Sequence, residues 1–398
     1  MNRLAALLTG RTKIALVAGG IMWVVWAVGC ALGSGNLDVT GQVIGADHTA
    51  FHTAAVLIAD GQGTALYDFP DLATFRARQE EITGKPRFLN PFRNPPFYAL
   101  LYVPTARLPH LASYAIWAVA GLFVLVAGLR LIHGPGFGRP LAWSLSFFPV
   151  FAAVSFGQNT LLSFGVFAVV YRLLADGRRF PAGLAAGLLL FKPQLLLGLG
   201  IWWAFDARRY WPSVAGVALT GLALGGVSWL VAPEETAAWV RHLPEIARYD
   251  AFEYYNLQNP RGFGALLTGE KAVGNWLGLI GLVLGVAFFV GVWRPHREDV
   301  PVLFAMAVFV TLWASPHTMT YEWALAVIPA VLLWDSRPEQ QPTWLVLFAI
   351  AWVALFLSAP LAKAQVQTLG IAIQLSVPVM AFVGIRASRA LRADQCSI

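Results

Sequence analysis

The chain has 398 residues, of which 58% are hydrophobic and 12% are charged, and its mean hydropathy is +0.62. Soluble globular domains carry about 25% charged residues, so the composition excludes a soluble domain and indicates an integral membrane protein. The formal net charge of +7 comes from short basic clusters between apolar runs, a pattern typical of cytoplasmic membrane loops, so nucleic acid is not an expected partner.

The first apolar run, residues 14–32, is too long for the apolar core of a signal peptide, so we expect it to remain as a membrane anchor. Residues 33–94 follow as a long polar segment, here called the first outer loop. A loop of this length is usually either functional or disordered. Its helical periodicity indicates a folded segment, and we expect the chemistry of the protein there.

Asp47 is the residue on which the functional interpretation centres. It opens a predicted helix over residues 47–59, and a second helix is predicted over residues 72–82. At the start of a helix, a carboxylate either caps free backbone N–H groups or remains available for chemistry. The apolar face of the first helix consists of Phe51, Ala54, Ala55 and Ile58.

The whole chain, residues 1–398, is predicted to be one all-α polytopic membrane domain. Residues 97–109 contain Pro104 and are short for a span, which needs about 20 residues. A second outer loop, residues 232–271, interrupts the apolar pattern and suggests an interfacial element. We expect about 12 transmembrane helices, in a range of about 10–13. The further apolar runs cover residues 112–132, 141–156, 161–174, 182–205, 211–231, 273–293, 302–314, 323–334, 344–358 and 369–385.

Two topologies are compatible with these runs. In the first, the N-terminus is cytoplasmic, residues 97–109 do not span, and residues 182–205 form a hairpin that turns at Lys192-Pro193. In the second, residues 97–109 span and residues 182–205 form one helix of comfortable length, but several arginines move outside. The positive-inside rule favours the first topology, and both place the outer loops on the outer side of the cell (inner) membrane. The first topology keeps in the cytoplasm Arg130, Arg139, Arg172, Arg178, Arg179, Arg208, Arg209, Arg294, Arg297, Arg337, Arg386, Arg389 and Arg392.

Polar motifs interrupt the apolar pattern, and the first topology brings all of them to the outer side. They are F-G-Q-N at residues 156–159, F-K-P-Q at 191–194, A-S-P-H-T-M-T-Y-E at 314–322, and an Asn-rich part of the second outer loop. Turn chemistry, a snorkelling lysine and local backbone hydrogen bonding are the structural alternatives. An ionisable residue deep in an apolar run is functional by default, which favours a binding role for Lys192.

His48 and His52 stand four residues apart beside Asp47, a spacing that can contribute to a metal site. The sequence offers no strong third ligand nearby and no D-x-D pair in either outer loop. We therefore expect no metal and no other cofactor, and consider both histidines as substrate-binding candidates or as side chains in the headgroup layer.

The ordered set of motifs resembles glycosyltransferase family 87 from about Ile14 to Trp334. It comprises Asp47 with the following F-H-T-A-A-V-L-I-A-D-G, then N-P-P-F-Y, F-G-Q-N, A-G-L-L-L-F-K-P-Q and S-P-H-T-M-T-Y-E-W. The resemblance implies a GT-C-like fold and an inverting transfer of mannose or a similar hexose or pentose from a polyprenyl-phosphate donor. It also implies a general base in the first outer loop, which Asp47 matches by position. The family usually has an aromatic-rich stretch after this Asp, whereas Phe51 and two histidines stand here, which leaves the sugar open.

Glycosyl transfer from a phosphate leaving group requires a carboxylate that takes the acceptor proton, and cationic or N–H groups around the departing phosphate. We assign the first role to Asp47 and the second to Lys192, Arg93 and His317, the last as a cation. The expected acceptor is a lipid or glycan at the periplasmic or extracellular surface. The remaining substrate-binding candidates are His48, His52, Asn94, Gln158, Asn159, Asn256, Asn259 and Arg261.

A multi-span transporter or flippase for a lipid-linked or polar substrate is the alternative class. Lys192-Pro193 and Ser315-Pro316 would then be helix breaks at a substrate site. The absence of a visible internal repeat and the presence of two large outer loops argue against this class. A non-catalytic subunit that shares the fold is a third possibility, because fold does not determine function.

Overall fold

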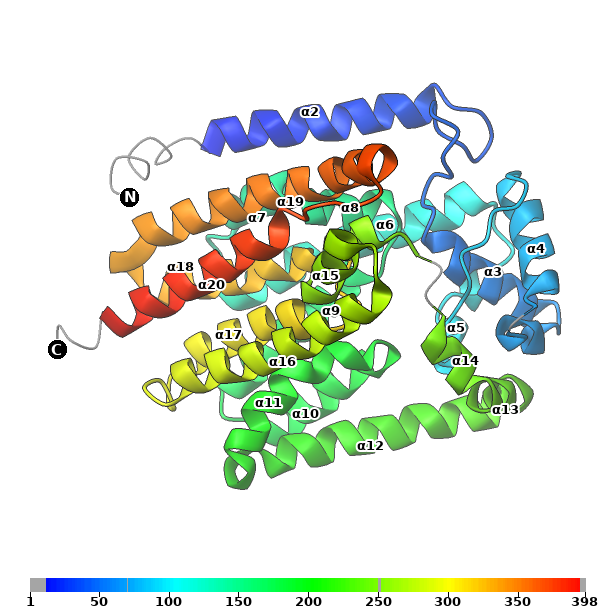
Figure 1. Ribbon diagram of the computed structural model, residues 1–398. Coiled ribbons are helices and arrows are strands. Elements are labelled where there is room, and N and C mark those ends of the chain that lie inside the picture. Colours follow the sequence, from blue (N-terminus) through cyan, green and yellow to red (C-terminus); the bar gives the residue numbers. More distant parts are fainter. Residues whose placement is uncertain (1–11, 70, 250–251, 394–398) are drawn as a thin grey trace.

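The computed structural model describes residues 12–69, 71–249 and 252–393, and over these residues the chain is helical, with isolated bridges in place of strands (Figure 1). This confirms the all-α prediction. Long helices run side by side, and the short helices of the outer loops gather at one end of the bundle. α2 (Thr12–Ala31) begins and α20 (Ser376–Ala393) ends at the opposite end. The N-terminus, predicted to be cytoplasmic, lies outside the described residues.

The first outer loop is folded, and its two predicted helices are confirmed. Its elements are α3 (His48–Ala59), η1 (Gly63–Tyr67) and α4 (Ala73–Thr83). Their apolar faces form a core of their own, in which Leu57, Tyr67, Phe75 and Phe92 are fully buried. Burial of such side chains stabilises a segment by about 1.5–3 kcal/mol each, which explains why this long loop is ordered.

Residues 97–109 contain no long helix. They hold only α5 (Pro96–Leu100) and η2 (Val103–Thr105), each with a proline in its first turn. Proline suits the first turn of a helix but not its interior, so Pro104 prevents a continuous helix here.

Four helices in the described part of the chain are long and apolar enough to cross a membrane, namely His110–His133, Ala207–Val231, Lys271–Trp293 and Pro338–Leu369. Further apolar helices have only 10–17 residues, so the predicted 12 spans are not confirmed. One cause lies in residues 141–156, where the chain becomes extended at Phe147 and Pro149 stands in the first turn of a new helix, so two short helices replace one span. The bundle elements are α6 (His110–His133), α7 (Gly138–Ser146), α8 (Phe148–Ser155), α9 (Thr160–Ala175), α12 (Ala207–Val231), α16 (Lys271–Trp293), α17 (Val300–Ala314), α18 (Val327–Ser336), η7 (Pro338–Gln340) and α19 (Gln341–Leu369).

Residues 182–205 belong to a hairpin and not to one helix. α10 (Arg179–Gly187) and η3 (Leu188–Phe191) lead to Lys192, and η4 (Pro193–Leu196) and α11 (Leu197–Phe205) lead back. The guanidinium groups of Arg179 and Arg209, on either side of this hairpin, each lie 5.8 Å from the ring centre of Tyr210. The two ends of the hairpin therefore lie together, as the first topology requires.

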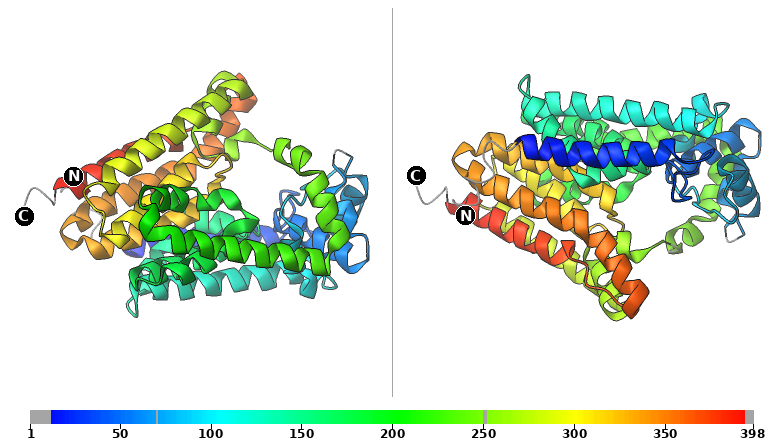
Figure 2. Two further views of the ribbon diagram at one scale, coloured as in Figure 1. Left: turned by 90° about the horizontal axis from the view of Figure 1, so that it is seen from below. Right: turned by 90° about the horizontal axis from the view of Figure 1, so that it is seen from above.

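The second outer loop packs across the first. Its elements are α13 (Pro233–Arg241), α14 (Leu243–Arg248), η5 (Tyr254–Asn256) and α15 (Pro260–Thr268). α13 contacts η1 so closely that a Cβ atom on Gly63 would fall 2.1 Å from Glu235 Oε1. A bridge pairs Leu257 with Met319 and so holds the turn before η6 (Thr320–Ala326). Figure 2 shows α12 and α16 diverging towards this end, with the α13–α14 segment running between them.

An ion pair anchors the tip of the hairpin to η6. Lys192 Nζ lies 2.9 Å from Glu322 Oε1, and the two side chains are only 13% and 6% exposed. Glu322 also accepts a hydrogen bond from the backbone N–H of Met319 at 2.8 Å. Removal of one partner of such a pair leaves an uncompensated buried charge, whereas replacement of both by apolar residues is often neutral.

We expect Glu322→Leu to lower the free energy of unfolding by about 3–5 kcal/mol, because it leaves the Lys192 ammonium without its partner. The double variant Lys192→Met, Glu322→Leu should recover most of this loss. Glu298→Gln removes an exposed pair with Arg209 and serves as the control, with an expected change below about 1 kcal/mol. Unfolding titrations in mixed micelles measure these changes. A Glu322→Leu protein as stable as the parent would show that the pair does not anchor the tip.

Cysteines at Thr64 and Thr268, in a background without the native cysteines, should react with an impermeant maleimide in intact spheroplasts. Both side chains are exposed and belong to the outer loops, which the positive-inside rule places outside. Arg178→Cys, in the basic turn between α9 and α10, is the matched control and should react only after lysis. Protection of both outer positions until lysis would reverse the orientation.

Candidate active site

A cavity of about 430 Å³ lies where the first outer loop, the hairpin tip, the α13–α14 segment and the turn before η6 meet. Phe51, Phe191 and Trp239 form part of its apolar wall. The structure brings six of the predicted site residues to this cavity, which are Asp47, Arg93, Asn94, Gln158, Lys192 and His317. They come from segments up to 270 positions apart in the sequence, so the site is formed by the tertiary fold and not by a local motif.

The backbone of Asp47 is held by the F-G-Q-N turn. The N–H groups of Asp47 and His48 both donate to the carbonyl of Phe156, at 2.8 and 3.2 Å. Gly157 has a φ of +72°, and a Cβ atom there would lie 2.6 Å from His48 Cβ, so glycine permits this close approach. The Asp47 side chain makes no capping hydrogen bond, so the alternative of a simple helix cap is wrong.

The carboxylate of Asp47 accepts one hydrogen bond at each oxygen. Asn90 Nδ2 donates to Oδ1 at 3.0 Å, and Gln158 Nε2 donates to Oδ2 at 2.9 Å. Burial raises the pKa of Asp47 above its ordinary value of 3.8, while Gln158, Lys192, Asn90 and Arg93 oppose this rise. Each oxygen keeps acceptor capacity for a substrate hydroxyl, as a general base requires.

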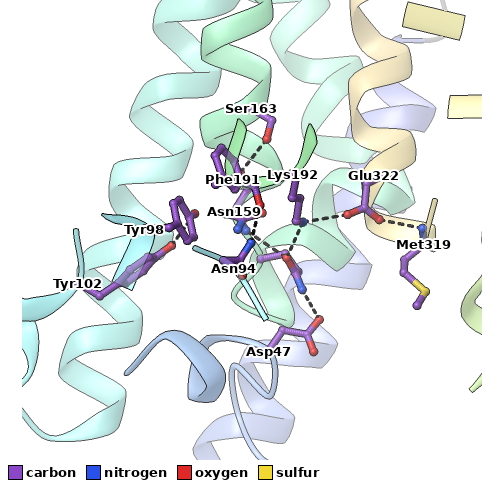
Figure 3. Close-up of polar contacts among 11 residues, drawn as sticks. Asp47, Asn94, Tyr98, Tyr102, Asn159, Ser163, Phe191, Lys192, Met319 and Glu322 are labelled. Atoms are coloured by element: carbon purple, nitrogen blue, oxygen red, sulfur yellow. Dashed lines mark hydrogen bonds and ion pairs between the residues drawn. The ribbon is translucent and has the colours of Figure 1, made fainter. Parts of the chain in front are cut away.

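Lys192 is committed to protein partners on two sides. Besides its ion pair with Glu322, Nζ donates to Gln158 Oε1 at 3.2 Å. Asp47, Gln158, Lys192 and Glu322 thus form one continuous row of polar contacts. Figure 3 labels Asp47, Lys192 and Glu322 in this row. Glu322 thus supplies the buried anionic partner of Lys192 from within the protein.

Arg93 is the cation of this cavity that has no carboxylate partner within the described ranges. Its guanidinium lies 5.6 Å from the ring centre of Tyr249, a cation–π contact, and the longer-range field of Asp47 acts on its charge. A planar guanidinium presents several N–H donors in the geometry that phosphate oxygens accept. Arg93 is therefore the group best placed to receive an anion.

The surroundings of His317 favour its neutral imidazole form. Burial lowers its pKa from 6.5 to about 4, and the positive charges of Arg93 and Arg261 act in the same direction. These surroundings disfavour the cationic form that we expected for His317. A neutral imidazole next to Arg93 can still donate one hydrogen bond to a phosphate oxygen.

His48 and His52 do not reach the cavity. They are 0% and 2% exposed and stack ring on ring at 5.9 Å, and His48 Nε2 lies 2.9 Å from Ser113 Oγ. Burial lowers the pKa of both imidazoles, that of His52 to about 4. No group of three His, Cys, Asp or Glu residues that could hold a metal occurs among residues 12–69, 71–249 and 252–393.

The other predicted binding residues lie outside the cavity and support its walls. Asn159, 3% exposed, lies beside Tyr98 at a separate cavity of about 20 Å³ (Figure 3). Asn259 caps α15 and donates to the carbonyl of Ser315 at 2.7 Å. Arg261 donates to the carbonyl of Pro316 at 3.5 Å, and the carbonyl of Asn256 accepts from Thr320 at 3.3 Å. The last three hold the turn that carries His317.

Sequence reasoning missed Glu322, Asn90 and Trp239 as parts of the site. Glu322 opens an apolar run, so it is a second buried ionisable residue that could have been paired with Lys192. Asn90 and Trp239 carry no such signal, since one stands in a proline-rich stretch and the other in an amphipathic helix.

The profile of glycosyltransferase family 87 matches residues 92–316. No curated protein and no solved structure matches the chain. The matched stretch contains Arg93, Gln158 and Lys192, whereas Asp47, His317 and Glu322 fall outside it. Because the match covers more than half of the 398 residues, and because apolar helices form the scaffold, the chain belongs to glycosyltransferase family 87 and is a membrane glycosyltransferase.

Proposed function

We propose that the protein transfers mannose or a similar hexose or pentose from a polyprenyl-phosphate donor to a lipid or glycan acceptor, with inversion and without a metal. The reaction takes place at the outer face of the cell (inner) membrane. One observation carries the proposal: a hydrogen-bonded carboxylate, Asp47, faces the same cavity as the guanidinium of Arg93, which has no ion pair with a carboxylate among the described residues.

In the proposed reaction, Asp47 takes the proton of the acceptor hydroxyl while the oxygen of that hydroxyl attacks the anomeric carbon of the donor sugar. The bond between that carbon and the phosphate oxygen breaks, and the bonding electrons leave with the phosphate. Arg93 stabilises the charge that develops there, with His317 and Lys192 as further donors. Attack on the face opposite to the phosphate inverts the configuration at the anomeric carbon.

The position of the cavity supports a transferase over a transporter. Transporters bind their substrates near the midplane on broken helices. Here the break at Lys192 is the tip of a hairpin, and the cavity it lines is shared with the outer loops. A site at this end gives a lipid-linked donor access from the bilayer and a glycan acceptor access from outside.

Asp47→Asn should lower turnover by about 10²–10⁴-fold, because the amide keeps the size of the side chain but cannot accept a proton. Asp60→Asn is the matched control, since Asp60 lies in the same loop but pairs with Arg78 and Arg107. In the parent, activity should fall as pH drops through the raised pKa of Asp47, above the ordinary value of 3.8, since only the ionised form is a base. Release of polyprenyl phosphate against pH measures both effects, and near-normal turnover of Asp47→Asn would place the base elsewhere.

Arg93→Met should raise the KM for the donor and lower kcat by about 10²-fold, because the phosphate carries more charge in the transition state than in the bound donor. The double variant Lys192→Met, Glu322→Leu, which leaves no unpaired buried charge, should act in the same direction but less strongly, since the Lys192 charge is balanced by Glu322 in the parent. His317→Ala should be weaker still. Arg107→Met, whose guanidinium is exposed and bound to Asp60, is the control. Donor-dependent turnover at fixed acceptor gives these values. Unchanged donor kinetics in Arg93→Met would remove Arg93 from the phosphate site.

A further inference from the structure

Gln158 connects the two halves of the row of polar contacts in the cavity. Its Nε2 donates to Asp47 at 2.9 Å, and its Oε1 accepts from Lys192 at 3.2 Å. We infer that Gln158 is a positioning residue that couples the proposed base to Lys192, so that a donor phosphate arriving at Lys192 makes Asp47 more reactive. The inference rests on the proposed function and replaces the predicted role of Gln158 as a substrate ligand.

The orientation of the Gln158 amide is fixed by its neighbours. The ammonium of Lys192 can only donate, and the ionised carboxylate of Asp47 can only accept. A flipped amide would place its N–H₂ group against the ammonium and its oxygen against the carboxylate. The side chain therefore has one orientation that satisfies both partners, and the assignment of its oxygen and nitrogen follows from the contacts.

The backbone around Gln158 keeps the bridge at constant length. The carbonyl of Phe156 accepts from the N–H groups of Asp47 and His48, so the turn and the start of α3 are joined directly. The neighbouring Gly157 packs against His48 with no room for a side chain. Gln158 and Asp47 therefore move together, and a change at the Lys192 end reaches Asp47 through the amide.

The direction of the coupling follows from polarisation. A cation bound to the amide oxygen makes the N–H₂ group a stronger donor, because hydrogen bonds in a chain reinforce one another. A stronger donor stabilises ionised Asp47 and makes it a weaker base. When the phosphate of the donor engages Lys192, this polarisation and the field of the ammonium at Asp47 both decrease. Asp47 then becomes more basic when the donor is present.

Asn90 offers a matched comparison. It donates to the other oxygen of Asp47 at 3.0 Å, and its side chain also reaches the carbonyl of Ala46 at 3.3 Å, with no contact to Lys192. Gln158→Leu and Asn90→Leu each remove one donor from the carboxylate. Each variant should move the acid limb of the pH profile to higher pH, because Asp47 loses a donor that stabilises its ionised form. Each should nevertheless lower kcat by roughly 10–100-fold, because the carboxylate also loses the hydrogen bond that holds it in position.

A double-mutant cycle with Lys192→Met separates the two amides. The effects of Gln158→Leu and Lys192→Met should be non-additive by roughly fivefold or more, because both interrupt the same connection. Those of Asn90→Leu and Lys192→Met should combine within about twofold. Additivity in both cycles would overturn the inference. A Gln158→Leu enzyme whose acid limb is unshifted and whose KM alone is raised would also overturn it, because this result would make Gln158 a substrate ligand.

A second variant covers a loss of folding in Gln158→Leu. Gln158→Glu keeps the size of the side chain and still accepts a hydrogen bond from Lys192, but it places a carboxylate against Asp47. The acid limb of its pH profile should therefore lie at higher pH than that of the parent. An unshifted limb in this variant also overturns the coupling. The proposed function is rejected if the parent shows no turnover that depends on Asp47. If the parent is active and the effects in both double-mutant cycles are additive, only the coupling is rejected.

Discussion

A charge that is buried at the outer end of a membrane bundle has to be balanced within the protein, and the ion pair of Lys192 and Glu322 meets this requirement. The lysine stands at the tip of a hairpin between α10 and α11, and the glutamate opens the segment that continues into α18. Neither charge has enough solvent around it to stand alone. The pair therefore fixes the distance between two parts of the chain, and the cavity lies beside this connection.

The balance of charge across the cavity is uneven, and this unevenness suits the proposed chemistry. Lys192 has a carboxylate partner, whereas Arg93 rests on an aromatic ring. Asp47 is held by two amides, which orient it without neutralising it. A phosphate-linked sugar would supply the negative charge that Arg93 lacks and a hydroxyl acceptor would supply the proton that Asp47 can take, so the substrates complete the electrostatics of the site.

Local patterns were sufficient to predict the helical class and the helices α3 and α4, because each depends on apolar spacing within a short stretch of sequence. The turn at Lys192-Pro193 was favoured by the distribution of arginines over the loops of the whole chain, whereas the length of the apolar run favoured one helix. The partner of Lys192 was not predictable in this way, because Glu322 follows 130 residues later.

Spacing also placed His48 and His52 on one helical face but did not indicate which face. They lie in the core behind the cavity, because the opposite side of α3 faces the substrate space. Polar residues of the second outer loop, such as Asn259, were predicted to be substrate ligands. Asn259 instead donates to a backbone carbonyl, a contact that the composition of the loop does not reveal.

The stacked imidazoles behind Asp47 have a consequence for acid tolerance. In an unfolded chain His48 and His52 would take up protons near their ordinary pKa of 6.5, whereas burial keeps them neutral in the folded protein. Below that pH the unfolded state binds more protons, so the first outer loop loses stability as the surrounding medium acidifies. If the loop lies on the proposed outer side, it is exposed to the pH of the external medium. The lowest pH at which the protein is active then depends on proton uptake by these buried histidines as well as on protonation of Asp47.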